Sequence, residues 1–239
     1  MTDITMDVDT KALRQRILTL AIQGKLTDQR KEDGTAQDLY NQIQEEKQRL
    51  IKEKKIKKTK KLPVITEDEI PFDIPENWMW VRLGDILYVL SGRDLTKAEQ
   101  LSKQTNTSIP YITGASNFDK GNLIITAWTD VPVTIAKKGD ILLTVKGTIG
   151  KTAVLPIDKA HIARQIMALR KFNDKNNLET GYLLAYLSYH IQSLKAKAKS
   201  MIPGIDRPTV LSSIIPLPPL AEQKRIVEKL NKLLPLCEA

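Results

Sequence analysis

The sequence predicts an α+β protein in which a β-rich central region is flanked by helices at both ends of the chain. Segments 10–25, 35–50 and 220–234 carry apolar residues at helical steps of three, four and seven positions. Between residues 80 and 172, short apolar runs are separated by turns rich in Gly, Asn and Pro, which is typical of strands. Segment 179–199 has a helical pattern and follows these strands instead of alternating with them, so a parallel βαβ sheet is not expected.

Composition limits the class of protein. A chain of 239 residues can bury a proper core, and its 41% hydrophobic and 27% charged content is that of a soluble globular protein. No apolar run reaches the ~20 residues of a membrane span. The acidic start MTDITMDVDT has no signal-peptide pattern, so we expect a cytoplasmic protein without membrane contact. The single cysteine, Cys237, excludes an intrachain disulfide, and neither His161 nor His190 has acidic residues at metal-site spacing, so no bound metal is expected.

The first helix is expected to start at Thr10 and to place Leu13 and Ile17 on its inner face. Gly24 provides a C-terminal stop, because glycine readily adopts the left-handed conformation that ends helices. A polar loop then leads to the second helix.

The second helix is expected to begin at Thr35, with Asp38 three residues later in an arrangement like a capping box. Its apolar stripe contains Leu39, Ile43 and Leu50. Such a narrow stripe buries too little surface to hold a helix of this length alone. The second helix therefore needs a partner helix, and the C-terminal helix has a similar stripe.

The C-terminal helix follows Pro218 and Pro219, because proline suits the first helical turn but cannot continue a strand ladder. Glu222 falls in that first turn, where negative charge suits the helix dipole. We expect the N- and C-terminal helices to pack together as a coiled-coil-like spacer. The apolar residues expected to make these contacts are Leu13, Ile17, Leu39, Ile43, Leu50, Leu220, Val227, Leu230 and Leu234.

Three parts of the chain are expected: a helical region, residues 1–61; a central domain, residues 62–216; and a C-terminal helix, residues 217–239. The central domain opens with an acidic linker that contains three prolines. Trp78 and Trp80 close this linker and are expected to be core anchors.

Within the central domain, strands are expected in segments 109–117, 122–128 and 161–172. The run KKGDILLTVKGTIGKTAVLP predicts a turn, a buried strand over residues 141–145, a glycine turn and a second strand that reaches Leu155.

Positive charge is concentrated in two regions of a chain whose net charge is +9. Residues 47–61 hold 9 basic and 1 acidic side chains, and residues 80–216 hold 18 basic and 10 acidic side chains. The linker between them holds 5 acidic side chains and none that is basic. Two basic regions separated by an acidic hinge suggest a polyanionic partner such as nucleic acid.

No constellation of residues indicates catalysis. The string from Gly147 to Thr152 ends like a phosphate-binding P-loop. That motif has four residues between its glycines, whereas only two separate Gly147 from Gly150, and a strand is expected to follow. The sequence has neither the Asn/Asp-Pro-Pro-aromatic tetrad of a methyltransferase nor the acidic cluster of a metal-dependent nuclease. A Ser/His/Asp triad stays open, although neither histidine has a context that argues for one.

Instead, the turns of the central domain are rich in side chains that suit nucleic acid. Arginine reads guanine and Gln or Asn reads adenine through paired hydrogen bonds, whereas Lys, Ser and Thr more often hold phosphates. The candidate DNA-binding residues are Arg93, Lys97, Ser116, Asn117, Lys146, Thr148, Lys151, Arg164, Gln165, Lys199 and Arg207.

Four strings in this order resemble the specificity subunits of type I restriction–modification enzymes. LRQRILTLAIQGKL is similar to a helical lead-in of that family, and IPENWMWVRLGDI to the entry of its recognition domain. KKGDILLTVKGTIGKTAVL is similar to a central strand with its glycine turn, and IIPLPPLAEQKRIV to the exit into a spacer helix. The resemblance covers nearly the whole chain, and the exit string is its most specific part.

The resemblance implies a half-length specificity subunit with a single target-recognition domain, since the family generally carries two. Such a chain would be no enzyme: it would read half of a bipartite site in double-stranded DNA and dock a modification subunit. That subunit would bind S-adenosylmethionine and methylate adenine, and a restriction subunit would use ATP and magnesium. Two copies, or this chain and another half-subunit, would pair through their helices. Arg164 stands where the resemblance would lead us to expect asparagine, so its role in base reading is in question.

Two other classes stay open at this stage: a stand-alone DNA-binding nuclease or degenerate NTPase, and a helical adaptor without a DNA role.

Overall fold

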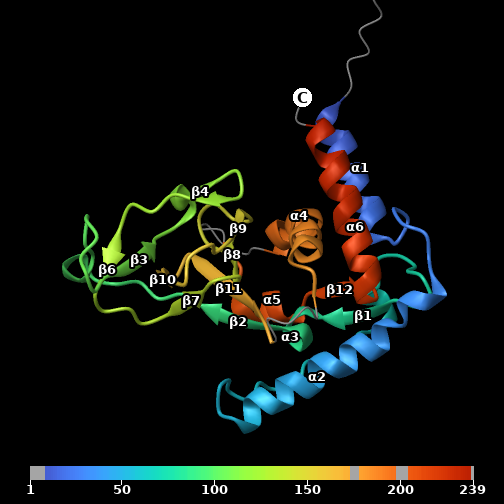
Figure 1. The fold of residues 1–239 in the computed structure, drawn as a ribbon, viewed down its shortest axis with the longest axis horizontal. Coiled ribbons are helices and arrows are strands. Elements are labelled where there is room, and N and C mark those ends of the chain that lie inside the picture. The colour runs from blue at the N-terminus through green and yellow to red at the C-terminus, as the bar shows by residue number, and fades with distance from the viewer. Residues whose placement is uncertain (1–8, 173–177, 198–203, 238–239) are drawn as a thin grey trace, which may run out of the picture.

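The computed structural model describes residues 9–172, 178–197 and 204–237. A β-rich module lies on one side of the molecule, and a helical arm stands beside it (Figure 1). The α-helices are α1 (Thr10–Ile22), α2 (Ala36–Lys52), α3 (Leu83–Ile86), α4 (Thr180–Lys197), α5 (Arg207–Ser212) and α6 (Leu220–Leu233). The short 3₁₀ turns are η1 (Lys31–Asp33), η2 (Glu67–Glu69), η3 (Lys97–Glu99), η4 (Ala115–Asn117) and η5 (Leu234–Cys237). The predicted α+β class is confirmed.

Two four-stranded sheets form the β-rich module. The first sheet is antiparallel and has the order β2 (Leu87–Ser91), β11 (Ile166–Lys171), β8 (Ile141–Thr144) and β9 (Thr152–Val154). The second has the order β6 (Trp128–Thr129), β3 (Ile109–Ile112), β10 (Lys159–Ile162) and β7 (Ile135–Lys137), with β10 parallel to β3. A small hairpin joins β4 (Phe118–Asp119) to β5 (Asn122–Leu123), and β1 (Met79–Arg82) pairs with β12 (Ile214–Leu217).

Two strand predictions need correction. The run 122–128 forms paired strands only at its ends, in β5 and β6, and between them the Ile124 carbonyl accepts a hydrogen bond from the Asn117 side chain. The run 161–172 is two strands, β10 and β11, which belong to different sheets. A tight turn separates them, in which the Ile166 N–H donates to the Ala163 carbonyl at 2.9 Å.

The arms from the two ends of the chain pack together, as expected: α1 and α6 lie side by side (Figure 1). Arg225 of α6 donates to Asp33 of η1 at 2.7 Å, and the Lys229 ammonium donates to the Leu26 carbonyl at 2.7 Å. Helix α4 packs against both arms. It is tied to β12 through the buried hydroxyls of Tyr182 and Tyr186, which donate to backbone carbonyls.

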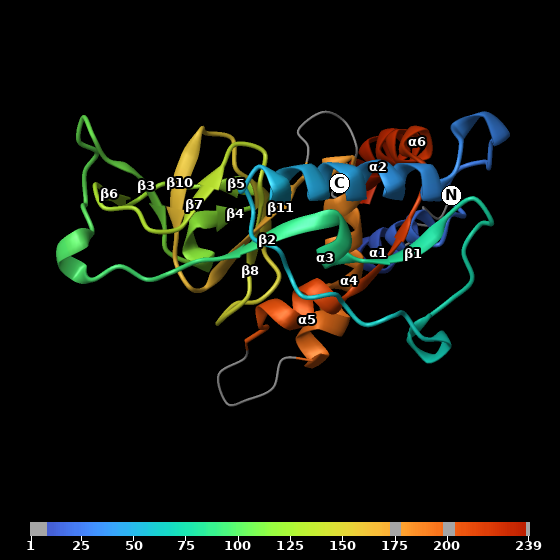
Figure 2. The ribbon, with the colours of Figure 1, turned by 90° about the horizontal axis from the view of Figure 1, so that it is seen from below.

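The prediction that the second helix packs against the C-terminal helix was wrong. Helix α2 runs across the lower part of the molecule in Figure 1, on the side seen in Figure 2, and packs on α3. Gln44 and Lys47 donate to the carbonyls of Asp85 and Gly84 at 2.8 and 3.0 Å. The predicted Thr35 cap is confirmed, since its hydroxyl oxygen accepts from the Asp38 N–H.

The predicted contact residues of the helices divide into buried and exposed ones. Ile17, Leu39, Ile43 and Leu230 are buried, whereas Leu50, Leu220, Val227 and Leu234 are partly buried against the same core. Leu13 is 40% exposed, because α1 turns Ile17, Leu18, Ala21 and Ile22 inward instead. Leu234 starts η5 and does not continue α6. Among the described helices, none is long and apolar enough to cross a membrane.

Arg82, at the end of β1, joins the acidic linker to the core. Its guanidinium is 5% exposed and donates to both carboxylate oxygens of Glu69 at 2.7 Å. It also donates to the carbonyls of Pro63, Val64 and Ser212. A bidentate arginine holds a carboxylate more firmly than a single point charge would. Through these contacts, Arg82 joins the linker to both ends of the central region.

The clamp predicts a stability component that is lost in acid. Hydrogen bonds from Arg82 and from the Thr66 N–H lower the pKa of Glu69 from 4.5 to about 2. Because the folded state depresses this pKa, the component is present above pH 4.5 and disappears as pH falls toward 2. We expect urea unfolding to show wild type more stable than Glu69→Gln above pH 4.5, with the difference shrinking toward pH 2. Glu67→Gln, the matched control, should follow wild type, and a difference that is independent of pH would contradict the prediction.

Candidate nucleic-acid interface

Three turns that are far apart in the sequence meet at one end of the first sheet. The pairing of Ile166 with Thr144 and of Met167 with Ser91 places residues 92–94, 145–151 and 163–165 together. Hydrogen bonds continue beyond the strands: the Val145 N–H donates to the Gln165 carbonyl at 2.8 Å, and the Gly92 N–H to the Ile166 carbonyl at 3.0 Å. We call these three turns the recognition end.

Arg93 has an exposed side chain, and a buried histidine holds its backbone. The His161 Nδ1 accepts from the N–H groups of Val133 and Thr134 at 3.2 and 3.1 Å. Backbone N–H groups can only donate, so Nδ1 is the acceptor of a neutral ring, and Nε2 donates to the Arg93 carbonyl at 2.8 Å. Burial lowers the pKa of His161 below 6.5, which keeps the ring in this neutral form near pH 7.

Arg164 is also at the surface of the recognition end. Its side chain is 66% exposed and pairs with Asp94 at 2.7 Å, and the Asp94 carboxylate accepts from the Arg164 N–H as well. An exposed ion pair of this kind contributes little to stability. The guanidinium can therefore exchange Asp94 for another acceptor, such as a base edge or a phosphate, at small cost.

The glycine turn presents Lys146 and Thr148 to solvent. Gly147 and Gly150 have φ values of 69° and 95°, which an L side chain rarely adopts, so both positions favour glycine. Strand β9 follows the turn, as expected, in place of the helix that a P-loop requires. Lys146 also forms a β-bridge with Gly204, which brings the chain before α5 to the recognition end.

Ser116 and Lys151 lie at one margin of this surface. The Lys151 ammonium donates to the carbonyls of Ala115 and Phe118 at 3.0 and 3.1 Å, so it ties η4 to the glycine turn and still carries an exposed charge. Ser116 is exposed beside it. These two candidates are therefore neighbours, close enough to contact the same phosphate backbone of DNA.

The prediction that the Asn117 side chain contacts DNA was wrong, because this side chain is buried. It is 1% exposed, and its carbonyl oxygen accepts from the N–H groups of Thr113 and Gly114 and from the Thr113 hydroxyl. Its amide donates to the Ile124 carbonyl. This side chain organises its own loop and has no group left to offer a base.

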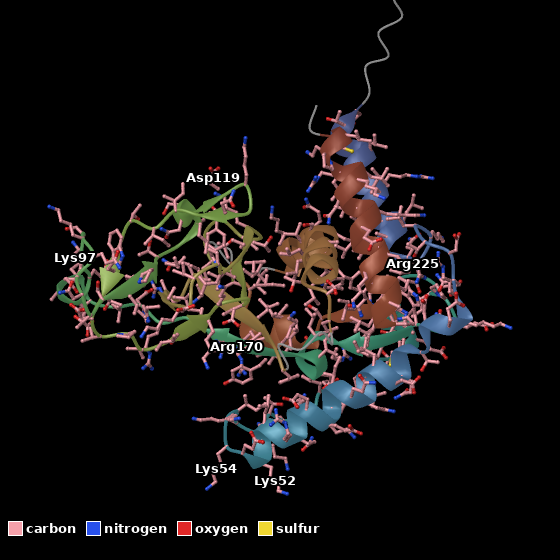
Figure 3. The ribbon with its side chains drawn as sticks, viewed as in Figure 1. Lys52, Lys54, Lys97, Asp119, Arg170 and Arg225 are labelled. Atoms are coloured by element: carbon pink, nitrogen blue, oxygen red, sulfur yellow. The ribbon has the colours of Figure 1, made fainter. Side chains whose placement is uncertain are left out.

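Of the remaining candidates that the structure describes, only Gln165 belongs to the recognition end. Lys97 is at the outer edge of the β-rich module (Figure 3). Arg207 starts α5 and donates from Nε to the Val89 carbonyl at 2.9 Å. Gln165 belongs to the recognition end, but its side-chain oxygen is buried and has no partner in the described part of the chain. Lys199 lies outside the described residues.

Sequence reasoning missed Asp94 as part of this surface and the buried His161 as its support. Asp94 directly follows Arg93, which was the available signal for an internal competitor. His161 gave none, because its three hydrogen-bond partners, Val133, Thr134 and Arg93, come from two distant loops. Over the described ranges, no three His, Cys, Asp or Glu side chains gather closely enough to hold a metal ion.

Comparison with known proteins places this surface in a family context. Residues 75–237 match the family model described as type I restriction modification DNA specificity domain. The type I restriction enzyme EcoAI specificity subunit of Escherichia coli is 32% identical, over 98% of this chain and 41% of the relative. The EcoEI specificity subunit of Escherichia coli is 31% identical, over 95% of this chain and 40% of the relative.

Solved structures show the same fold. The HsdS subunit from Thermoanaerobacter tengcongensis superposes with a TM-score of 0.62 at 25% identity, over 96% of this chain and 49% of that one. A chain described under complex assembly and conformational transition of the type I R-M system gives a TM-score of 0.63 at 25% identity, covering 96% of this chain and 50% of that one. This chain thus spans about 40% of the length of the curated relatives and half of the solved chains.

Proposed function

The chain belongs to the type I restriction modification DNA specificity family, and on that premise we propose that it reads one half of a bipartite site in double-stranded DNA. In this proposal residues 62–216 are the target-recognition domain, and residues 1–61 and 217–239 are the arms that mount it on its partners. The chain supplies recognition and no bond-breaking chemistry.

The observation that carries the proposal is the recognition end. Three separate turns supply Arg93, Lys146 and Arg164, and the strand register brings these exposed cations to one end of the first sheet. Arginine forks suit guanine edges and lysine suits phosphates, so a single surface has both kinds of contact that sequence-specific binding needs.

The arms support a second part of the proposal, the docking of a modification subunit. Helices α1 and α6 pack on each other beside the β-rich module, and the three turns of the recognition end belong to other elements, so a protein partner and DNA would contact different residues (Figure 1). The modification subunit would bring S-adenosylmethionine, and a restriction subunit would bring ATP and magnesium. The role of this chain's residues is to bind and orient the DNA.

We further propose that two such units pair through their arms, as two copies of this chain. Leu13 on α1 and Leu236 in η5 are 40% and 69% exposed, and η5 packs on α1, so both leucines belong to the helical arm through which the pairing is proposed. Two-fold pairing would give a symmetric complex that reads a palindromic split site. Light scattering of the chain, alone and with the modification subunit, tests this. A persistent monomer at high concentration contradicts pairing, and a dimer only with another half-subunit replaces the homodimer by a hetero-pair.

Target identification comes first: methylome sequencing of a host that expresses the chain with its modification subunit should show a new methylated motif. Binding to a duplex with that motif can then be measured by fluorescence anisotropy. DNA cleavage by the purified chain alone would contradict the proposal, and so would salt-insensitive binding that a DNA competitor does not reduce.

Substitutions of Arg164 and of Lys146 are expected to weaken DNA binding in different ways. Arg164→Ala should weaken binding of the target by about 1–3 kcal/mol and relax the preference at one base pair, because arginine reads a base edge. Lys146→Gln should weaken target and scrambled duplexes equally and reduce the salt slope of log K by about 0.9, as for one lost phosphate contact. Equal losses on both duplexes for Arg164→Ala would contradict its assignment.

A further inference from the structure

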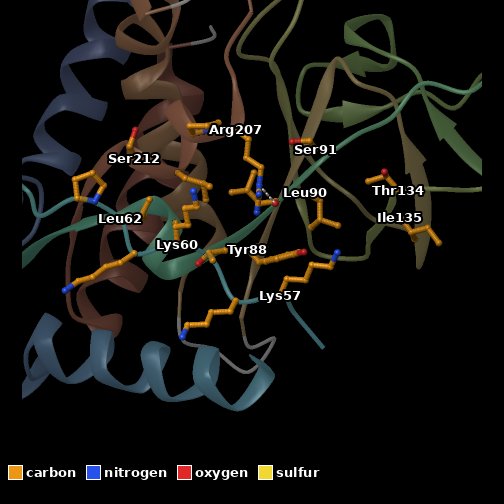
Figure 4. A pocket seen from close by; sticks show the side chains of 18 of the residues that line it. Lys57, Lys60, Leu62, Tyr88, Leu90, Ser91, Thr134, Ile135, Arg207 and Ser212 are labelled. Carbon is orange, nitrogen blue, oxygen red and sulfur yellow. Dashed lines mark hydrogen bonds between the residues drawn. The ribbon is translucent and has the colours of Figure 1, made fainter. Parts of the chain in front are cut away.

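A groove with a volume of about 1060 Å³ lies between the chain that follows α2 and the β-rich module (Figure 4). One wall is the extended segment 57–61, and the other contains residues 88–91 of β2, residues 133–135 and the start of α5. Its cations are Lys57, Lys58, Lys60, Lys61 and Arg207, and we call it the lysine groove.

The lysine groove has positive charge without compensation. Five of its lining residues are cationic, and none of those residues is Asp or Glu. Within the described part of the chain, none of the five cations makes an ion pair. Nearby cations behave differently: Lys47 lies 3.5 Å from Asp85, and Lys55 lies 2.8 Å from Glu53. Like charges held this close repel one another, so the groove attracts an anion.

The shape of the groove favours an extended polyanion over a small one. Segment 57–61 is neither helix nor strand, and all four of its lysines are exposed. A segment of five residues spans at most about 13 Å between its first and last Cα atoms, at about 3.3 Å per residue. One DNA strand rises about 3.4 Å per phosphate along the helix axis, and its phosphates are further apart along the strand itself, so a segment of this length faces several phosphates of one strand.

Arg207 closes the groove on the side of the β-rich module. Its Nε donates to the Val89 carbonyl at 2.9 Å, which fixes the guanidinium plane. Its Nη groups have no acceptor in the described chain. A fixed guanidinium with free donors suits a phosphate, because little side-chain entropy remains to be lost on binding.

The groove leads directly to the recognition end. Ser91 lines it, and the next two residues are Gly92 and Arg93. Val133 and Thr134 line it as well, and their N–H groups are bound by His161, whose other ring nitrogen holds the Arg93 carbonyl. A nucleic-acid strand that leaves the recognition end on this side therefore meets the five cations next.

We propose that the lysine groove binds the phosphate backbone of the duplex that flanks the recognised half-site. The inference rests on the proposed function and adds a second, sequence-independent contact to it. The recognition end chooses the sequence, and the groove holds the neighbouring DNA whatever its sequence.

The test is a charge-neutralising variant of the full chain, K57Q/K58Q/K60Q/K61Q, with binding measured against salt on target and scrambled duplexes of equal length. If each lysine contacts one phosphate, the slope of log K against log salt becomes shallower by about 3.6. Wild type then loses up to about 150-fold more affinity than the variant between about 50 and 200 mM salt. Both duplexes should be affected equally, and trimming the duplex to the half-site should bring wild type and variant together.

The matched control, K11Q/K31Q/K224Q/K232Q, removes the same charge from exposed lysines of the helical parts and should keep the wild-type slope. Thermal unfolding confirms that both variants are folded. An unchanged slope for the groove variant overturns the inference. Intact DNA binding with weakened binding of the modification subunit also overturns it, because the groove would then hold a protein. If wild type itself shows no salt-sensitive DNA binding, the proposed function fails instead.

Discussion

Replacing Glu222 with alanine is expected to lower the free energy of unfolding by about 3 kcal/mol, because this carboxylate is a fully buried junction of three segments. It accepts from the Trp78 indole N–H at 2.7 Å, from the Thr27 hydroxyl at 2.9 Å and from the Gln29 amide at 2.7 Å. Alanine leaves the Trp78 and Thr27 donors buried without an acceptor, and each such group costs about 1–3 kcal/mol. Urea unfolding measures the loss.

Two further variants make this prediction specific. Glu222→Gln keeps the shape but has one accepting oxygen for three donors, so its loss should fall between wild type and alanine. Glu228→Ala removes an exposed carboxylate from the same helix and should stay within about 0.5 kcal/mol of wild type. Equal stability of the Glu222→Ala and Glu228→Ala proteins would show that the junction does not hold the arm to the core.

Gly92→Ala is expected to disrupt the recognition end itself. A Cβ at this position would lie 2.0 Å from the Ala163 carbonyl oxygen and 2.6 Å from the Ile162 carbonyl oxygen. These are backbone atoms that cannot rotate away, so the two turns must separate. Their separation breaks the 2.9 Å hydrogen bond from the Arg93 N–H to the Ile162 carbonyl. We expect a stability loss of about 3 kcal/mol, the upper part of the range for overpacking, together with loss of target preference over scrambled DNA.

Gly114→Ala is the control for this change. Gly114 also belongs to the loop region of the module, but no atom lies within 4 Å of an added Cβ, and its φ of 171° is ordinary extended backbone. It should keep wild-type stability and target preference. If Gly92→Ala behaves like Gly114→Ala in urea unfolding and in binding of both duplexes, the close approach of the turns is not required for recognition.

Local patterns predicted the local structure well. The Thr35 cap, the turn before β8, the hairpin from β8 to β9 and the helix after the prolines all form where short-range chemistry places them. These elements depend on neighbours within a few residues: a cap needs a free N–H three positions on, and a turn needs a residue that tolerates its φ.

Patterns that had to choose between distant partners predicted less. The apolar stripe of α2 indicated a partner but could not say that α3, and not α6, provides it. Leu13 and Asn117 show the same limit at single positions, since periodicity placed Leu13 inside and residue type placed Asn117 at a base. Whether a side chain is buried depends on what packs against it.

The α+β class, the helices at both ends of the chain, the uneven charge and the strings that identify the family could all be read from the sequence, because each depends on residues close together in the chain. Long-range packing sets which turns form the recognition end, where the lysine groove runs and that Glu222 joins three segments. Those outcomes depend on contacts such as the one between Thr27 and Glu222, 195 residues apart, and no local pattern encodes which distant group will supply the partner.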